Sequence, residues 1–374
     1  MKKLKVMTIV GTRPEIIRLS EVIKLFDKLF NHILVHTGQN WDYNLNEIFF
    51  KDLKIRKPDY FLNSAGENLG QTLGNILSKS YDVLLKEKPD ALLILGDTNS
   101  ALSAIPAKRL KIPIFHMEAG NRCFDENVPE EINRRIVDHI SDVNLPYTEN
   151  SRYYLLMEGI KKEYIFVTGS PMTEVIWKNL NDIKKSKILN ELKIKNKKYI
   201  LLSSHREENI DIEKNFNYLI ESINTVAKNY NLPIIFSTHP RTLKKLNSKK
   251  IKLNKLVKIY KPFGFFDYIN LEMNSFCVLS DSGTLSEESA ILGFPAVLIR
   301  TSTERPEAID KGTIILGGID KESILRAIDM ATSLRSNNIP YNYIDEDVSE
   351  KVAKIIEGYT KIINKNIWSK GQGS

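Results

Sequence analysis

The sequence predicts two doubly wound α/β domains of similar size. Short apolar runs alternate with amphipathic stretches along the 374 residues, which is the pattern of parallel strands linked by helices. A chain of this length forms about two domains. The alternation pauses at a lysine-rich stretch, 184–198, which we interpret as a connection. We therefore expect an N-terminal domain over 1–180 and a C-terminal domain over 181–344.

The strands of the first domain are predicted from apolar runs that end at glycine or polar residues. They are 4–11, 32–38, 91–97, 112–120, 143–148 and 165–170. After the second run, the stretch 68–85 carries leucines and isoleucines at helical spacing, namely Leu69, Leu73, Ile76, Leu77 and Leu84. That spacing predicts a helix with one apolar face.

The second domain repeats the same alternation. Its strand candidates are 199–205, 232–239, 258–262, 276–281, 295–300 and 313–317. The remaining segment, 345–374, is predicted to contain a final amphipathic helix over 346–365.

Composition excludes several classes of function. Fifty-four basic against 46 acidic residues give a net charge of +8. The lysines are scattered, with no basic stripe interleaved with aromatics, so we favour a solvated surface over a nucleic-acid interface. No apolar stretch approaches the roughly 20 residues that span a bilayer. Cys123 and Cys277 fit a reducing cytoplasm better than a disulfide framework. No CxxC, HxH or HExxH spacing occurs, so we expect no metal site.

Polar residues follow the predicted strands at the edge where doubly wound sheets bind ligands. A cleft between two such domains would gather them: Arg13, Gln39, Asp97, Glu118, His205, His239, Asp281 and Arg300.

The turn after the first strand, "VGTRPE", has one glycine and lacks the GxGxxG of dinucleotide-binding folds, which argues against NAD. Pro14 suits a first helical turn, and Arg13 is then placed to pair with a phosphate. The alternative is that Arg13 caps a neighbouring strand end.

Acidic residues follow the next two strand ends. Asp97 in "LGDTNS" either contributes a catalytic carboxylate or caps a helix. In "HMEAGNRCFDENVPEEINRR" (116–135), Glu118 follows a strand directly, and Glu130 with Glu131 opens a helix. The simple interpretation is a loop and a helix start. The sharper interpretation is a set of carboxylates that face a substrate.

The second domain carries a candidate anion site. Ser282, Gly283 and Thr284 follow a strand and open a helix, where backbone N–H groups favour a diphosphate. Glu288, one turn further, either binds ribose hydroxyls or interacts with the helix dipole. Most isolated histidines are structural, but His205 in "SSHREEN" lies beside Arg206 at a strand end, which favours a functional role.

Together these motifs resemble the non-hydrolysing UDP-N-acetylglucosamine 2-epimerase family. The matching stretches are "GTRPE", "GDT", "HMEAGNR", "PEExNR", "SSHREEN", "DSGxxxEE" and "TERPE", in order between residues 11 and 307. The resemblance implies two Rossmann-like domains of GT-B architecture with the active site in the interdomain cleft. It also implies a last helix that returns to the first domain, no cofactor, and a homodimer.

The family's reaction gives the carboxylates a purpose. UDP is eliminated to leave a 2-acetamidoglycal, and its re-addition inverts C2. By resemblance, Asp97, Glu118 and Glu130 are acid–base residues, and His205 assists the leaving diphosphate. UDP contacts come from Arg13, Ser282, Gly283, Thr284 and Glu288, with Arg18, Gln39, Arg122 and Arg300 as further candidates for substrate binding.

The choice of sugar follows a finer resemblance. "HMEAGNRCFD", "GTRPEIIRLS" and "KPDYFLN" are similar to the branch that forms UDP-N-acetyl-L-fucosamine from the 6-deoxy-L-talo epimer, for capsule and O-antigen synthesis. UDP-GlcNAc/UDP-ManNAc epimerisation is the other possibility. The alternatives outside this activity are a GT-B glycosyltransferase, a silent UDP-sugar sensor and a hydrolysing epimerase.

Overall fold

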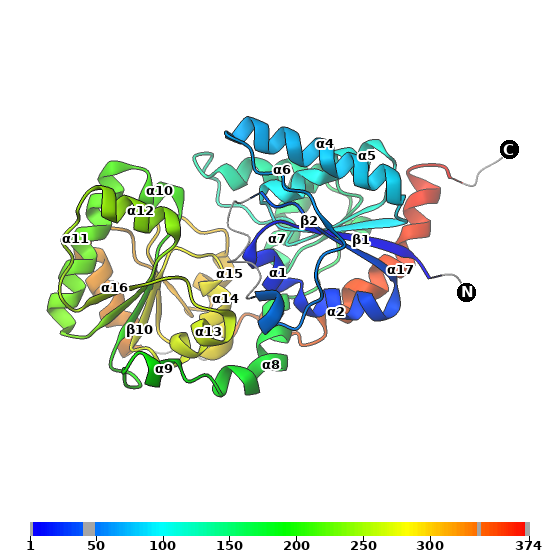
Figure 1. Ribbon diagram of the computed structural model, residues 1–374. Coiled ribbons are helices and arrows are strands. Elements are labelled where there is room, and N and C mark those ends of the chain that lie inside the picture. Colours follow the sequence, from blue (N-terminus) through cyan, green and yellow to red (C-terminus); the bar gives the residue numbers. More distant parts are fainter. Residues whose placement is uncertain (1–2, 40–48, 335–337, 371–374) are drawn as a thin grey trace. The chain divides into compact units, whose positions relative to one another are not determined.

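The computed structural model describes residues 3–39, 49–334 and 338–370. The chain divides into two compact units, the first comprising Met1–Trp177 with Asp345–Ser374 and the second Lys178–Ile344. Each unit contains one six-stranded sheet with helices on both faces (Figure 1). All the strand pairs are parallel. The predicted fold class, two doubly wound α/β domains, is confirmed.

The sheet of the first unit has the order β3-β2-β1-β4-β5-β6. The central strands are buried on both faces, as parallel strands between helical layers must be. The strands are β1 (Lys5–Val10), β2 (Asn31–His36), β3 (Tyr60–Phe61), β4 (Ala91–Leu95), β5 (Ile114–Met117) and β6 (Val143–Leu145).

Helices cover both faces of this sheet (Figure 1). On one face, α4 (Leu69–Glu87) and α5 (Ala104–Arg109) bury residues of β1 and β4. On the other, α2 (Ser20–Leu29) lies against the C-terminal helix α17 (Val348–Asn366). The remaining elements are α1 (Arg13–Arg18), η1 (Asn99–Ser103), α6 (Pro129–Ile140), α7 (Glu149–Met157), η2 (Lys162–Tyr164) and α8 (Pro171–Lys184), within which the chain enters the second unit.

Two sequence-based expectations for the first unit are wrong. No strand forms over 165–170: one bridge joins Asn144 to Ile165, and the chain then turns at Gly169 with φ +86° before α8 begins. Leu69 does not face the core, since it is 64% exposed in the first turn of α4, whereas Ile76 and Leu84 are buried. The short β3 was not predicted, because two residues carry no readable period.

The second unit has all six predicted strands in the order β12-β11-β10-β7-β8-β9. They are β7 (Ile200–Ser203), β8 (Ile234–Ser237), β9 (Val257–Tyr260), β10 (Cys277–Ser280), β11 (Ala296–Leu298) and β12 (Ile315–Leu316). Around them lie α9 (Ile188–Glu191), α10 (Glu207–Ile210), α11 (Glu213–Tyr230), α12 (Pro240–Ser248), α13 (Phe265–Asn274), α14 (Leu285–Leu292), α15 (Pro306–Asp310), α16 (Lys321–Ser333) and η3 (Tyr341–Tyr343).

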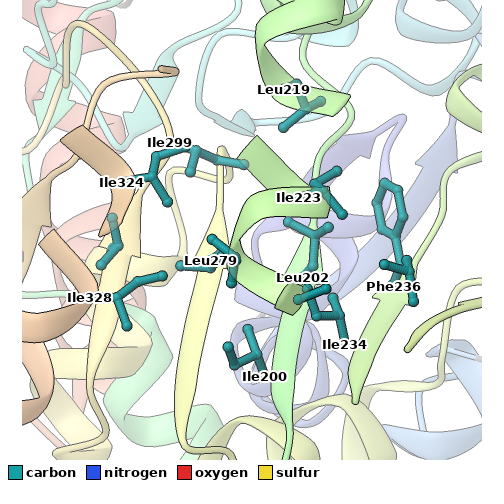
Figure 2. Packing of buried hydrophobic residues seen from close by; sticks show 14 of the residues in the cluster. Ile200, Leu202, Leu219, Ile223, Ile234, Phe236, Leu279, Ile299, Ile324 and Ile328 are labelled. Carbon is teal, nitrogen blue, oxygen red and sulfur yellow. The ribbon is translucent and has the colours of Figure 1, made fainter. Parts of the chain in front are cut away.

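Alternate residues of each strand in the second unit enter opposite cores. Ile200 and Leu202 of β7 pack with side chains of α11 and α16 (Figure 2). Tyr199 and Leu201 pack on the other side with residues of α13 and α14. This period of two fixes the register of the sheet, because a slip by one residue would exchange the two sets.

Both sheets share one topology when strands are counted within each unit. The first and fourth strands lie side by side, as β1 with β4 and β7 with β10. Connections leave such a pair in opposite directions and open a crevice at the carboxyl ends of the strands, where α/β proteins bind ligands. The turns at these points are 11–15 and 96–99 in the first unit and 203–206 and 281–284 in the second.

Candidate active site

Glu118 stands at the centre of the acidic group in the first unit. It follows β5 directly and holds a left-handed backbone conformation, with φ +63°, which costs a non-glycine residue about 1–2 kcal/mol. Its buried carboxylate accepts a hydrogen bond from Arg18 Nη1 at 2.6 Å. Asn121 Nδ2 and Tyr147 OH each lie 3.4 Å from its oxygens. An arginine at this distance stabilises the ionised carboxylate.

Asp97 lies in the turn beside Glu118. Its Oδ2 accepts hydrogen bonds from Arg134 Nε at 3.0 Å and Nη2 at 2.5 Å. The preceding residue, Gly96, has φ +71°, and a Cβ there would lie 3.6 Å from Glu118 Oε2. The two predicted carboxylates therefore occupy neighbouring turns, and each is paired with an arginine. Asp97 does not cap a helix, because Thr98 is the N-cap of η1.

Glu130 and Glu131 open α6 as expected, but their surroundings differ. Glu131 is fully buried, and its Oε2 accepts hydrogen bonds from Arg134 Nη1 at 2.9 Å and the Cys123 backbone N–H at 3.1 Å. Glu130 is partly exposed at the helix start. The structure thus assigns Glu131 to the framework and leaves Glu130 as the candidate for acid–base chemistry.

Arg13 and Gln39 follow adjacent strands. Arg13 begins α1, and its guanidinium lies 5.7 Å from the centre of the Phe49 ring. Gln39 lies against the same turn, since a Cβ on Gly11 would be 3.2 Å from Gln39 Cδ. Both residues belong to the edge where the first unit presents its acids.

Arg122, a candidate for substrate binding, points into the protein. Its Nη1 donates to Asp138 Oδ2 at 2.7 Å, while Nε and Nη2 donate to the two Glu158 oxygens at 2.7 and 2.6 Å. Its side chain is buried. This geometry favours support of the turn that follows Glu118 over contact with a ligand.

Sequence reasoning assigned no role to Glu15 or Arg134, although both belong to the motifs it singled out. The buried Glu15 carboxylate accepts hydrogen bonds from the Gly11 N–H at 3.0 Å, Thr12 Oγ1 at 2.7 Å and Ser100 Oγ at 2.5 Å. It thereby ties the turn of Arg13 to the turn of Asp97. Burial raises the pKa of Glu15 to about 7. Their place inside the motifs was the only signal in the sequence, because the burial that marks them as candidates is seen in the structure alone.

In the second unit, Asp281 organises the turn that carries His205. Its buried carboxylate accepts hydrogen bonds from Ser204 Oγ at 2.7 Å and from the backbone N–H groups of His205 and Arg206 at 3.0 and 3.1 Å. His205 Nδ1 lies 3.2 Å from Asp281 Oδ1. Burial opposes ionisation, but the interactions with His205 and Ser204 outweigh it, so the pKa of Asp281 is far below its usual value. The His205 side chain stays 39% exposed and is open to a ligand.

The predicted anion site lies at the start of α14. Thr284 is the N-cap residue; its hydroxyl lies 3.0 Å from Ser282 Oγ and donates to Glu288 Oε2 at 3.1 Å. A Cβ on Gly283 would meet Glu304 Oε1, so a larger residue here would displace the Glu304 carboxylate. The neighbouring Glu287 is fully buried beside Arg305 Nη2 at 3.1 Å. Glu288 therefore suits a ribose contact better than Glu287 does.

Glu304 bridges two arginines next to this site. It accepts from Arg300 Nη1 at 2.7 Å and from Arg206 Nη2 at 3.2 Å. Nε and Nη2 of the buried Arg300 make no hydrogen bond within the described parts of the chain. A buried guanidinium with spare donors is suited to an anionic ligand.

Among the described residues, no group of three or more His, Cys, Asp or Glu is arranged to hold a metal ion. Across 3–39, 49–334 and 338–370, no helix has the length and apolarity needed to cross a membrane.

Two solved structures share this architecture along almost the whole chain. The UDP-N-acetylglucosamine 2-epimerase from Rickettsia bellii is 49% identical with a TM-score of 0.92, and the match covers 98% of this chain and 100% of that one. The Methanocaldococcus jannaschii UDP-GlcNAc 2-epimerase, solved in complex with UDP-GlcNAc and UDP, is 37% identical with a TM-score of 0.88 over 95% of this chain and 99% of that one.

The fold and its two groups of polar residues define a two-domain α/β enzyme of GT-B architecture. The family model described as UDP-N-acetylglucosamine 2-epimerase matches residues 25–357. A UDP-N-acetylglucosamine 2-epimerase of Methanococcus maripaludis is 41% identical over 368 residues, which cover 96% of this chain and 99% of that protein. The chain belongs to the non-hydrolysing UDP-N-acetylglucosamine 2-epimerase family, whose members are isomerases, and the resemblance seen in the sequence is confirmed.

Proposed function

We propose that this protein inverts C2 of a UDP-N-acetylhexosamine by eliminating and re-adding UDP. The observation that carries the proposal is the strained Glu118, whose buried carboxylate pairs with Arg18 beside the Asp97 turn. Backbone strain persists where the surrounding structure enforces it, and such residues cluster at active sites.

The chemistry requires a base and a stabilised leaving group. No carbonyl adjoins C2 of the sugar ring, so its C–H bond is not acidic in the ground state. As the C1–oxygen bond to UDP breaks, positive charge develops at C1 and a carboxylate takes the C2 proton. The products are UDP and a 2-acetamidoglycal. Return of a proton to the opposite face of C2 and re-addition of UDP at C1 complete the inversion.

The first unit supplies the acid–base groups in this proposal. Glu118 pairs with Arg18 and Asp97 pairs with Arg134, and one of these two carboxylates takes the C2 proton. Glu130 is the third acid–base group. Arg13 and Gln39 contact the substrate from the neighbouring turn.

The second unit holds the nucleotide in this proposal. Ser282, Gly283 and Thr284 bind the diphosphate at the start of α14, and Glu288 binds the ribose. Arg300 adds positive charge. The exposed ring of His205, oriented by Asp281, stabilises the charge that develops on the departing UDP.

The sugar is proposed to be the 6-deoxy-L-talo nucleotide of the UDP-N-acetyl-L-fucosamine branch, with UDP-GlcNAc as the alternative. Asn121 supports this choice, since it stands where the glucosamine enzymes resembled by the sequence carry leucine. Its amide lies 3.4 Å from Glu118 and accepts a hydrogen bond from Ser151 Oγ at 3.0 Å. The residue that distinguishes the branch thus touches a proposed catalytic carboxylate.

Proton NMR in D2O tests the activity directly, with each UDP-sugar in a separate sample. Deuterium at C2 of an equilibrium mixture of UDP-linked epimers is the expected result. Protons retained at C2 of both sugars while UDP still binds would instead support a GT-B glycosyltransferase or a UDP-sugar sensor. Free sugar as the product would indicate a hydrolysing epimerase.

Variants separate the three carboxylates. Asp97→Asn, Glu118→Gln and Glu130→Gln should each abolish turnover and retain UDP affinity, whereas Glu126→Gln should keep full activity. Glu126 is the matched control because it lies in the same loop, with its side chain 79% exposed. An active variant removes its residue from the mechanism.

We further propose a cytoplasmic homodimer that supplies a polysaccharide precursor. The free Cys123 and Cys277 fit a reducing compartment. Light scattering on the purified protein tests the dimer: a mass near twice the 42.9 kDa of one chain is expected.

A further inference from the structure

A fully buried histidine lies beneath the two acidic turns of the first unit. His116 is the third residue of β5 and has no exposed surface. Its Nε2 lies 2.8 Å from the carbonyl oxygen of Gly96, and its Nδ1 lies 2.9 Å from Asp138 Oδ1 in an ion-pair contact that lacks the alignment of a hydrogen bond. The proposed mechanism gives no role to either His116 or Asp138.

The partners of the ring indicate its charge. A carbonyl oxygen accepts hydrogen bonds and cannot donate them, and the same holds for an ionised carboxylate. A neutral imidazole has only one N–H, so one of its nitrogens would then direct a lone pair at an acceptor. An imidazolium ion, with both nitrogens protonated, donates to the Gly96 carbonyl and faces the Asp138 carboxylate with a positive charge instead of a lone pair.

The charges around Asp138 agree with this state. The second oxygen of Asp138 accepts from Arg122 Nη1, and Arg122 also pairs with Glu158. With His116 charged, this group of two cations and two carboxylates is neutral overall. With His116 uncharged, the group carries a net negative charge in the interior, which is costly.

Asp138 itself behaves as a firmly ionised group. Full burial would raise its pKa, but the interactions with His116 and Arg122 prevail and hold the pKa below its ordinary value. Asp138 therefore remains an acceptor, as the argument about the ring requires.

The pair contacts the backbone on both sides of the proposed catalytic residues. Gly96, whose carbonyl faces His116, immediately precedes Asp97. The Gly120 N–H, two residues after Glu118, lies 3.1 and 3.2 Å from the two Asp138 oxygens. Gly96, Glu118 and Gly120 all have positive φ, so these turns adopt a conformation that local sequence alone does not favour.

We propose that His116 is a buried imidazolium ion which, with Asp138, positions Asp97 and Glu118 for proton transfer. The charge state stands on the structure alone, and the positioning role rests on the proposed epimerase function. His116 and Asp138 are positioning residues, because they act through the backbone of the turns and contact no substrate.

Nitrogen NMR of the histidine rings measures the charge state without reference to activity. In protein labelled with ¹⁵N-histidine, His116 is expected to show two protonated ring nitrogens at neutral pH. His36 is the internal control. It is equally buried, but its Nδ1 accepts from the Gly38 N–H and burial lowers its pKa to about 4. His36 should therefore show one unprotonated nitrogen, and an unprotonated nitrogen on His116 overturns the proposal.

Kinetics test the positioning role. Asp138→Asn removes the charge at nearly constant volume and should lower kcat on the order of 100-fold, as small displacements of reacting groups do. UDP affinity should stay within about threefold. Asp138→Glu keeps the charge but lengthens the side chain, so its kcat should lie between that of Asp138→Asn and that of the native protein. The matched control is His139→Gln. His139 lies on the same helix with its side chain 47% exposed, so this substitution should leave kcat unchanged.

The outcomes separate the two proposals. Unchanged kcat in a folded Asp138→Asn variant overturns the positioning role. Loss of UDP affinity in parallel with kcat also overturns it, because that result indicates general unfolding. If the unmodified protein epimerises neither sugar, the proposed function fails, while the ring signals of His116 still decide its charge.

Discussion

The buried carboxyl of Glu15 makes the stability of the first unit depend on pH. Among the residues that the structure describes, Glu15 has no charged partner, and its hydrogen-bond donors are a backbone N–H and two hydroxyls. Burial therefore prevails and raises its pKa from the ordinary 4.5 to about 7. The folded protein binds this proton more tightly than the unfolded chain does.

The sign and size of the effect follow from linkage. The contribution is fully present below pH 4.5, decreases as the unfolded chain ionises, and is lost once the pH passes about 7. The two pKa values differ by about 2.5, which corresponds to roughly 3 kcal/mol at about 1.4 kcal/mol per pKa unit. Glu15→Gln has no charge to bury, so this part of the pH dependence should disappear.

Tryptophan fluorescence during urea unfolding is the appropriate assay. The two tryptophans in the described part of the chain, Trp177 and Trp368, belong to the first unit, so their signal follows that unit. Between about pH 5 and about pH 8.5, the free energy of unfolding of the native protein should fall by roughly 2.5 kcal/mol more than that of Glu15→Gln, because a part of the effect is already lost at pH 5. Glu67→Gln, at an exposed position, should behave as the native protein does. Equal pH dependence in the native protein and Glu15→Gln would refute the reasoning.

Four further outcomes are expected. Arg134→Met leaves two carboxylates of the first unit without this partner and should lower the free energy of unfolding by about 3–5 kcal/mol. The control is Arg135→Met: the Arg135 side chain is 40% exposed, so its loss should cost less than about 1 kcal/mol. Equal losses in the two variants would contradict the pairing of Arg134. Asp281→Asn should weaken UDP binding at least about tenfold in calorimetry, because the turn of His205 loses a carboxylate that accepts several hydrogen bonds; native affinity in this variant would argue against that support. Gly283→Ala should likewise weaken UDP binding because its Cβ meets Glu304, whereas Gly74→Ala, with open space around it, should add up to about 1 kcal/mol to stability. Turnover in the deuterium assay should persist in excess EDTA, and its loss with recovery on adding a divalent cation would show that the mechanism is incomplete.

The sheet topology explains why the positions of so many candidate site residues were predictable. Parallel strands present their carboxyl ends at one edge, so any polar residue that follows a buried apolar run lies at that edge. Asp97, Glu118, His205 and Asp281 were located by this rule alone. Thr284 and Gly283 were located because residues at a helix start have their own signature of small and hydroxyl side chains.

The failures have an equally physical origin. The run 165–170 is apolar enough for a strand, yet only one bridge to β6 forms before Gly169 turns the chain. The pairing of Arg122 was likewise not visible in the sequence, because its partners Asp138 and Glu158 lie 16 and 36 residues away from it. Sequence patterns report how buried a position is, and they do not report which distant groups meet there.

The sequence by itself determined the fold class, most of the strands and the family, because each depends on local periodicity or on ordered motifs. The tertiary structure alone decided which acids are paired with arginines and which histidine ring lies against a carboxylate. Arg18 meets Glu118 and His116 meets Asp138 only after strands and helices from separate parts of the chain have packed together. Electrostatic state is a property of neighbours in space, and packing, more than sequence distance, selects those neighbours.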